Sequence, residues 1–350
     1  MKITLASYHT VTLRHGGPKT QIQQTRNYLE QAGVEVKLMD TWEERKAVLD
    51  CDLFHLFASN FGTYDLARYL KAHDLPFVVS PIFFTRRSPR AVRLVSTADR
   101  LVRHLIPGIW SDYGITRDIC HWAEHCLPNT SAEQHLMVSG LGIPVDAVTV
   151  VPNGVEDRYL NGNPDLFYQK YGIKEFVLHV GHIGVERKNT LFLIRALGKL
   201  DVPAVIIGRI YPSKEAAACL EEAGRNRNLL IIEGLDHDSP MLSAAYAACD
   251  VFVLPARYET PGIAALEAGL AGAKVVITPY GGTKDYFGNM ATYVNPYSVD
   301  SIRKGIESAL SRDTDDRLKR HIQENFLWQR VAQNTVQVYE SVLGTGVQIS

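Results

Sequence analysis

The sequence predicts an α/β protein built from two doubly wound parallel sheets. Short apolar runs alternate with helix-like stretches, as in a parallel sheet covered by helices, and this pattern occurs twice along the chain. With 350 residues the chain is long enough for two ordinary hydrophobic cores. Between the two halves lies PNGVEDRYLNGNPDLF, whose Pro, Gly and Asn content indicates an irregular domain connection.

Four apolar runs are expected to form the strands of the first domain: KITLAS (2–7), VEVKLMD (34–40), DLFHLF (52–57) and PFVVS (76–80). The second domain has five: FVLHVG (176–181), AVIIG (204–208), LLIIEG (229–234), DVFVLP (250–255) and KVVIT (274–278). In parallel sheets ligands gather beyond the carboxyl ends of strands, so we expect the ligand site between two such sheets.

The composition is that of a globular enzyme. Hydrophobic residues make up 46% and charged residues 21%, with a net charge of -1, so neither disorder nor a nucleic-acid partner is indicated. The five cysteines form no CxxC pair, which favours a reducing compartment, and we expect the cytoplasm. No apolar run approaches the ~20 residues that span a bilayer, and the opening run is too short for a signal peptide. Any membrane association is expected to be peripheral.

The stretch after the run DVFVLP combines a turn and a short helix in a way that suits an anion. Glu259 lies in the turn, and Glu267 lies inside the predicted helix IAALEAGLAG. Backbone amides at a helix start lack partners and carry the positive end of the helix dipole, so they can hold a phosphate. The amides expected to do so are those of Gly262, Ile263 and Ala264.

Two glutamates beside one anion site fit a nucleotide sugar. Carboxylates only accept hydrogen bonds, and a nucleotide sugar has hydroxyl donors on both sides of its diphosphate, on the hexose and on the ribose. The alternative for an isolated pair is a solvated loop charge at Glu259 and a helix-face residue at Glu267.

Arg187 and Lys188 follow the run FVLHVG and can supply the counter-charge. Cations at a helix start oppose the helix dipole, so an anionic ligand explains their placement. Lys188 is the favoured contact for the diphosphate. A nicotinamide enzyme is the alternative for this fold class, but no strand-to-helix turn has the GxGxxG fingerprint.

These motifs resemble those of the retaining glycosyltransferases of family 4, which have the GT-B fold of two Rossmann-like domains facing a central cleft. The family's pattern of Glu, seven residues and Glu reads ETPGIAALE here. HVGHIGVERKNTLFLIRAL resembles the first strand, phosphate loop and helix of the family's C-terminal domain, and FLWQRVAQNTVQVYESVL resembles its final helix. The resemblance is dense from about residue 176 to 296 and thinner before residue 150.

The resemblance implies a metal-independent, cofactor-free transfer of a hexose, with retention, from a UDP- or GDP-sugar to a polysaccharide or lipid-linked oligosaccharide. It places acceptor binding in residues 1–155 and donor binding in 156–325, with a helix at 326–343 packing back on the first domain. The implied catalytic residues are Glu259, Lys188 and Arg187. The implied donor contacts are Gly16, Gly17, His182, Gly262, Ile263, Ala264 and Glu267.

The chain departs from the family pattern at two places. His182 stands where the family often has Arg, so Arg187 is expected to take over that charge. Many relatives have a His after the fourth strand, where this chain has Ser80 and Pro81, so we assign no catalytic histidine to the first domain. A nucleotide-sugar epimerase and a non-catalytic sugar-nucleotide-binding subunit remain as alternatives on the same fold.

Two further motifs carry functional hypotheses. HWAEH (121–125) matches the HxxEH pattern of inverted zinc peptidases, which we weigh as a minor alternative. Residues 86–103 form a basic amphipathic helix that is either a solvated face or a surface for an anionic membrane or acceptor. Its arginines are Arg86, Arg87, Arg90, Arg93, Arg100 and Arg103, and the first four are the candidate contacts.

Overall fold

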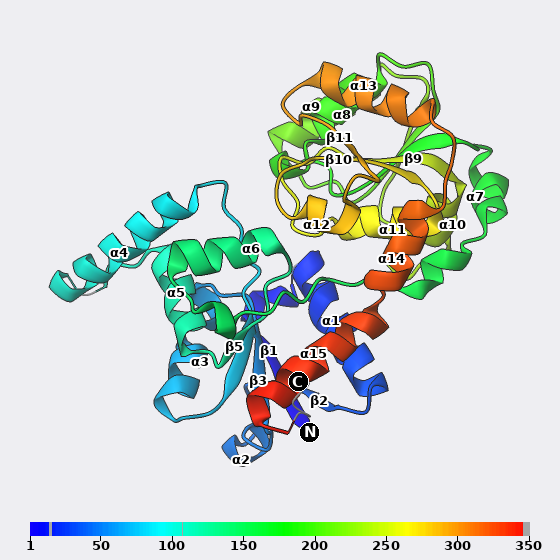
Figure 1. Ribbon diagram of the computed structural model, residues 1–350. Helices are drawn as coiled ribbons and strands as arrows, with labels where there is room; N and C mark the ends of the chain where they lie inside the picture. Colours follow the sequence, from blue (N-terminus) through cyan, green and yellow to red (C-terminus); the bar gives the residue numbers. More distant parts are fainter. Residues whose placement is uncertain (14–15, 107, 346–350) are drawn as a thin grey trace. The chain divides into compact units, whose positions relative to one another are not determined.

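The computed structural model describes residues 1–13, 16–106 and 108–345, and the chain separates into two compact units (Figure 1). The first unit runs from Met1 to Gly154 and resumes at Trp328, and the second comprises Val155–Leu327. Each unit is a parallel sheet with helices on both faces, which confirms the predicted α/β class with two Rossmann-like domains. That the two sheets face one cleft stays a prediction.

The sheet of the first unit has the order β2-β1-β3-β4-β5, with all strands parallel. This is a flavodoxin-like order, in which the direction of winding reverses between β1 and β3. The strands are β1 (Lys2–Ser7), β2 (Glu35–Leu38), β3 (Leu53–Phe57), β4 (Phe77–Ser80) and β5 (His125–Cys126). β3 is buried along its whole length, as its apolar sequence predicts.

Helices cover both faces of this sheet. On one face Ala67, Ile119 and Val92 pack against β3 and β4, and on the other Ile22 and Val331 pack against β1 and β3. The helical segments are η1 (His9–Val11), α1 (Gly17–Gln31), α2 (Arg45–Val48), α3 (Phe61–Ala72), α4 (Pro89–Leu105), α5 (Asp112–Trp122), α6 (Ser131–His135), η2 (Leu136–Leu141), η3 (Val145–Ala147) and α15 (Trp328–Leu343).

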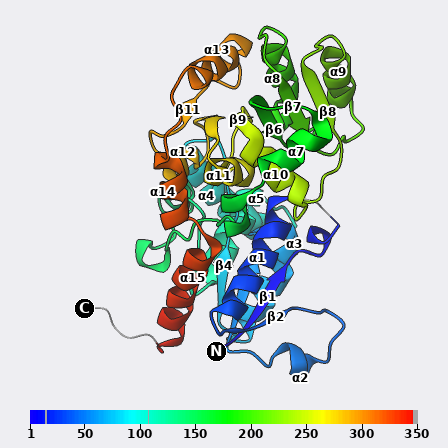
Figure 2. The same cartoon turned by 90° about the vertical axis from the view of Figure 1, so that its right-hand side faces the viewer.

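The last helix, α15, belongs to the first unit although it follows the second in sequence (Figure 2). Trp328 stacks near Tyr28 of α1 with ring centroids 6.4 Å apart. The Tyr339 hydroxyl lies 2.6 Å from Nδ1 of His55 on β3, and the other ring nitrogen of His55 lies 2.9 Å from Ser80 Oγ. Burial lowers the pKa of His55 to about 3, so this imidazole is neutral and the contact is part of the core.

The sheet of the second unit has the order β11-β10-β9-β6-β7-β8, again all parallel. The strands are β6 (Phe176–Val180), β7 (Ala204–Ile207), β8 (Leu229–Ile232), β9 (Cys249–Leu254), β10 (Lys274–Ile277) and β11 (Thr292–Tyr293). Strands β6, β7 and β8 extend the sheet one way and β9, β10 and β11 the other. The topological switch point, where ligands bind in such sheets, therefore lies between β6 and β9.

The helical segments of the second unit pack on both faces of this sheet, and Leu266 of α11 and Leu193 of α8 are among their buried contacts. The segments are η4 (Asp157–Asn161), α7 (Pro164–Tyr171), η5 (Glu186–Lys188), α8 (Thr190–Leu197), α9 (Lys214–Ala223), α10 (Pro240–Ala248), α11 (Ile263–Ala271), α12 (Thr283–Phe287), α13 (Val299–Leu310) and α14 (Arg317–Asn325). Among the described residues, no helix is long and apolar enough to cross a bilayer.

The zinc interpretation of HWAEH is wrong in its geometry. It requires both histidines on one helical face, but α5 ends at Trp122, and His125 belongs to strand β5. Ala123 between them has extended backbone angles, and His125 Nε2 lies 2.8 Å from Thr149 Oγ1. The motif therefore spans two elements and forms no helical metal-binding pair.

Candidate active site

Three of the predicted site residues meet at the switch point of the second unit. Glu259 follows strand β9, and Arg187 and Lys188 lie in the short η5 helix between β6 and α8. The carboxylate Oε1 of Glu259 lies 2.6 Å from Lys188 Nζ and 3.0 Å from Arg187 Nη1. Only 5% of Glu259 is exposed, so the cluster is largely shielded from solvent.

The electrostatics of this cluster keep the Glu259 carboxylate ionised. Burial alone raises the pKa of Glu259, but the charges and hydrogen bonds of Lys188 and Arg187 outweigh it, so the pKa lies below its ordinary value. The protein's own carboxylate thus compensates one of the two positive charges. An anion that contacts Lys188 has to compete with Glu259 for it.

The backbone of Glu259 is fixed by a glycine on the segment after β10. The Glu259 amide donates to Tyr280 O at 3.0 Å and its carbonyl accepts from the Gly282 amide at 2.9 Å. Gly281 has φ +100°, and a Cβ there would lie 1.9 Å from the Glu259 carbonyl oxygen. Only glycine combines this backbone angle with this close approach.

The loop that carries the two cations is also tied to the end of β9. Asn189, which begins α8 in a left-handed conformation with φ 60°, donates its side-chain amide to Pro255 O at 2.9 Å and Pro296 O at 2.7 Å. The backbone amide of Arg257 donates to the Arg187 carbonyl at 2.8 Å. These bonds fix the position of Lys188 relative to Glu259 before any ligand binds.

The start of α11 has the geometry expected for an anion site. Gly262 caps the helix with φ +73° and without a side-chain hydrogen bond, and the helix continues for nine residues from Ile263. The amides of Ile263 and Ala264 therefore lie at the positive end of the α11 dipole, with no side chain capping them.

Glu267 lies inside α11, as predicted, but it is more enclosed than the sequence suggests. Its Oε2 accepts from the Tyr246 hydroxyl at 2.6 Å, and its Oε1 lies 2.9 Å from His237 Nε2. His237 contacts Arg158 Nη2 through its other ring nitrogen at 2.9 Å. The structure therefore places the two motif glutamates in separate networks, Glu259 with cations and Glu267 with a phenol and an imidazole.

Sequence reasoning missed His237 and also His179. His179 on β6 is 1% exposed and its Nδ1 lies 2.8 Å from the Val253 carbonyl, which only a protonated Nδ1 can satisfy. Burial lowers the pKa of His179 to about 4, so the ring is neutral and Nε2 has a free acceptor lone pair. Nε2 has no hydrogen-bond partner among the described residues, and a Cβ on Gly181 would lie 2.9 Å from it. No motif marked this histidine.

The remaining predicted donor contacts follow the first strand of each unit, in a loop or at a helix start. His182 follows β6 and its ring meets that of Tyr211 edge-on, with centroids 5.0 Å apart. In the first unit Gly16 precedes α1 with φ +147°, and Gly17 is the first residue of α1. The structure thus places the glycine pair at a helix start beyond β1.

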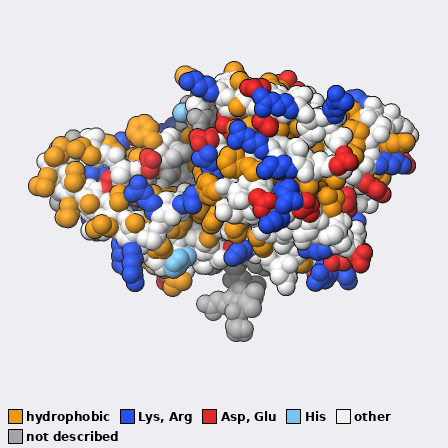
Figure 3. All heavy atoms as spheres, turned by 90° about the horizontal axis from the view of Figure 1, so that it is seen from above, with side chains coloured by type: hydrophobic (Ala, Val, Ile, Leu, Met, Phe, Trp, Pro, Cys, Tyr) orange, Lys and Arg blue, Asp and Glu red, His pale blue; other side chains and the backbone are white. Residues whose placement is uncertain are grey.

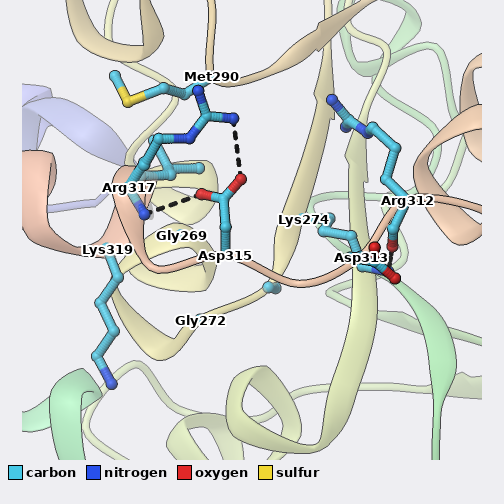
Figure 4. A pocket seen from close by; sticks show the side chains of 11 residues that line it. Gly269, Gly272, Lys274, Met290, Arg312, Asp313, Asp315, Arg317 and Lys319 are labelled. Atoms are coloured by element: carbon cyan, nitrogen blue, oxygen red, sulfur yellow. Dashed lines mark hydrogen bonds and ion pairs between the residues drawn. The ribbon is translucent and has the colours of Figure 1, made fainter.

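Another hollow of the second unit, of about 60 Å³, lies at the opposite edge of the sheet (Figure 4). Two of its basic residues are compensated locally: Lys274, the first residue of β10, pairs with Asp250 at 3.0 Å, and Arg317 pairs with Asp315 at 2.9 Å. Because it adjoins the amino end of β10, it lies away from the carboxyl ends where ligands of such sheets bind.

Two Rossmann-like units, the second with Lys188, Arg187 and Glu259 at its switch point, give the chain the GT-B architecture. Residues 167–326 match the family described as "Glycosyl transferases group 1". The matched part, just under half of the chain, is thus similar to this family of glycosyltransferases.

The curated proteins that the chain resembles include sugar transferases. The chain is 25% identical over 227 residues to MMP alpha-(1->4)-mannosyltransferase of Mycolicibacterium hassiacum, covering 61% of this chain and 53% of the relative. It is 27% identical over 254 residues to D-inositol 3-phosphate glycosyltransferase of Paenarthrobacter aurescens, covering 63% and 59%. The matched part is thus somewhat more than half the length of these curated relatives.

Solved structures share the fold at low identity. Sucrose-phosphate synthase of Thermosynechococcus elongatus superposes with a TM-score of 0.75 at 16% identity, covering 99% of this chain and 100% of that one. HepE of Anabaena, in complex with UDP, superposes with a TM-score of 0.68 at 16% identity, covering 97% and 100%.

Proposed function

We propose that the protein is a retaining glycosyltransferase of family 4, which moves a hexose from a UDP- or GDP-sugar to a polysaccharide or lipid-linked oligosaccharide without a metal ion. The observation that carries the proposal is the buried cluster of Glu259, Lys188 and Arg187 at the switch point of the second unit. The relatives named above are sugar transferases, and the HepE complexes contain UDP and UDP-glucose, which supports a uridine donor.

The leaving group of the reaction is a nucleoside diphosphate, whose growing negative charge has to be stabilised. Lys188 and Arg187 supply two fixed positive charges, and the amides at the start of α11 supply dipoles. These groups are already positioned by Asn189 and by the helix itself, so little reorganisation is needed when charge develops. Protein cations in these positions take the place that a divalent metal has in other transferases.

Donor binding is proposed to exchange the partners of Glu259. The diphosphate takes over the contacts with Lys188 and Arg187, and the carboxylate of Glu259 becomes available to accept hydrogen bonds from the hexose hydroxyls. The acceptor hydroxyl passes its proton to the leaving phosphate, so the transfer needs no side-chain base. Glu259 is then a positioning group for the sugar and is required for transfer.

Glu267 is proposed to bind the ribose. Each of its carboxylate oxygens already receives one hydrogen bond, from Tyr246 or from His237, but a carboxylate accepts about four in all. The two protein donors hold the carboxylate in one orientation, and the remaining lone pairs are left for the ribose hydroxyls.

The first unit is proposed to recognise the acceptor, with the Gly16–Gly17 pair allowing close approach of the backbone to the donor phosphates. Arg86, Arg87, Arg90 and Arg93 lie just before α4 and on its first turns, and all four are exposed. They are proposed to meet anionic groups of a lipid-linked acceptor or of the inner face of the cytoplasmic membrane.

Thermal unfolding with UDP, GDP and ADP, each with and without EDTA, tests the donor site. A ligand that binds only the folded state raises the melting temperature, so one diphosphate should stabilise the protein equally with and without EDTA. Lys188→Ala should lose this shift, and Arg317→Ala, in the other hollow, should keep it. If no diphosphate stabilises the protein, the donor site is assigned wrongly. If stabilisation requires the metal, the metal-free mechanism is wrong.

Transfer is tested separately. Glu259→Ala should abolish sugar transfer to the acceptor while the diphosphate shift persists, because the cations remain. Hydrolysis or epimerisation of the nucleotide sugar without acceptor would instead favour the epimerase alternative.

A further inference from the structure

Helix α4 of the first unit has its apolar stripe on the side that faces away from the protein. Val92, Ser96 and Asp99 are buried, whereas Leu94 is 73%, Leu101 63% and Leu105 82% exposed. With 3.6 residues per turn, the three leucines lie within about 40° of one another, on the opposite side of the helix from the buried residues. The stripe therefore packs against no part of its own unit.

Polar contacts hold the inner face of α4 in place. The Asp99 carboxylate pairs with Arg103 at 2.6 Å and accepts from the Ser111 amide at 2.8 Å, and Arg103 also pairs with Asp118 at 2.6 Å. Arg117 donates to the Ser96 carbonyl at 2.5 Å. Because the inner face docks through charge pairs, the leucines are not needed to attach α4. Their exposure calls for another explanation.

Exposed apolar side chains also follow the end of the helix, and cations border the stripe. Ile106, Ile109 and Trp110 are exposed beyond Leu105. Figure 3 shows hydrophobic side chains gathered at the left end of the view, where α4 lies in Figure 1, with basic side chains beside them.

The charges that border the stripe have one sign. Arg90, Arg93 and Arg100 are exposed on one flank, and none of them enters an ion pair within the described part of the chain. The acid of the helix, Asp99, is buried on the inner face and neutralised by Arg103. The outer face therefore combines an apolar stripe with bordering side chains whose described charges are all positive.

We propose that the outer face of α4 lies in the interface of an anionic membrane, with Leu94, Leu101 and Leu105 at the level of the acyl chains and the arginines at the lipid phosphates. An apolar stripe flanked by basic residues is the composition of helices that lie in the plane of a bilayer. A second copy of this chain fits less well, because pairing two such faces brings like charges together. The inference deepens the membrane part of the proposed function: attachment depends on apolar insertion, with the arginines adding electrostatic attraction.

Co-sedimentation of the full chain with vesicles tests this inference. The protein should pellet with phosphatidylglycerol-containing vesicles and much less with phosphatidylcholine alone. The double variant L101S/L105S should lower the partition coefficient roughly tenfold or more, because it removes several methylene equivalents from the acyl region. Leu220→Ser, an exposed leucine on α9, is the matched control and should bind like the wild type.

A double variant that removes two charges separates the electrostatic contribution to membrane binding from the apolar one. R93Q/R100Q should weaken binding to anionic vesicles and leave the weak binding to neutral ones unchanged, whereas Arg68→Gln on α3 should change neither. All variants should keep the wild-type melting curve, since the altered side chains are exposed. They should also keep the nucleoside diphosphate shift, which reports on the second unit, so a failed donor site and a failed membrane face give different results.

The inference is overturned if the wild type stays in the supernatant with anionic vesicles at low salt, or if L101S/L105S binds them as tightly as the wild type. It is also overturned if sedimentation velocity without lipid shows a dimer that L101S/L105S abolishes while vesicle binding is absent, since that assigns the face to a second copy.

Discussion

Replacing Lys188 by methionine keeps the length of the side chain but removes the ammonium group that lies 2.6 Å from the Glu259 carboxylate. The carboxylate is 5% exposed and retains only Arg187, at 3.0 Å, as a counter-charge. Its pKa, which now lies below the ordinary value, should rise because burial is no longer outweighed to the same degree.

The variant should lose stability because it leaves a buried charge partly uncompensated. Removal of one partner from a fully buried pair costs about 3 to 5 kcal/mol, and the retained Arg187 lowers our expectation to about 2 to 3 kcal/mol. The Lys188 side chain is 18% exposed, which also lowers the expected loss of stability. For a domain of this size the loss corresponds to roughly 4 to 12 °C in melting temperature.

Calorimetry at several pH values checks both the size and the cause. A carboxylate with a depressed pKa stabilises the fold above its unfolded pKa of about 4.3, and this contribution is lost as the pH falls through the folded pKa. The difference between wild type and Lys188→Met should therefore be largest near neutral pH and should shrink below about pH 4.3. Lys304→Met, an exposed lysine on α13, should cost less than about 1 kcal/mol.

The reasoning is refuted if Lys188→Met melts like the wild type at neutral pH and still gains stability from UDP or GDP. Such a result would mean that Lys188 neither compensates Glu259 nor contacts the diphosphate. A loss of stability with the same magnitude at every pH would instead show that packing, rather than charge, is what the lysine provides.

Two further variants test the supports of the site. Gly281→Ala should destabilise the second unit and abolish diphosphate binding, because φ +100° disfavours any Cβ and this one would lie 1.9 Å from the Glu259 carbonyl oxygen. Urea unfolding measures the loss. Gly198→Ala is the control that should be tolerated, since its Cβ would lie 3.5 Å from the Ile194 carbonyl oxygen. Burial lowers the pKa of His237, but its contact with Glu267 outweighs burial, so the pKa is raised. The pairing therefore stabilises the folded state fully below the unfolded pKa of about 6.5. This contribution is lost as the pH rises through the folded pKa. The melting difference between wild type and His237→Ala should thus be largest below about pH 6.5 and should narrow above it, and a constant difference would contradict the pairing.

The sequence was sufficient for nine of the eleven strands in the described part of the chain and for bringing Glu259 and Lys188 together, but the two-residue edge strands β5 and β11 were not predicted. Parallel strands carry long apolar runs, and residues that follow such strands gather at one edge, which is why Glu259 and Lys188 meet although 71 residues separate them. The turn chemistry of Gly262 likewise follows from its position before an apolar helix.

The parts that could not be predicted depend on contacts without a local signal. Tyr246 and His237 reach Glu267 from other segments, and neither lies in a motif that specifies a carboxylate partner. In α4 the spacing of the apolar residues indicates a helix with two faces but does not tell which face is buried. The contacts of this face with the next segment decide it. Arg103 pairs with Asp118 and Asp99 accepts from the Ser111 amide, which leaves Leu101 on the outer side.

The way the chain leaves and re-enters the first unit has a consequence for its synthesis. The Val155 amide donates to the Phe326 carbonyl at 2.8 Å, so the second unit begins and ends at one point and can close as soon as residue 327 has emerged. The core of the first unit is completed later, since Trp328 and Tyr339 supply part of it. On the ribosome the inserted unit should mature first, while the face of β1 and β3 that α1 and α15 share stays partly exposed until α15 arrives. The same adjacency of ends makes 155–327 the natural segment to express on its own.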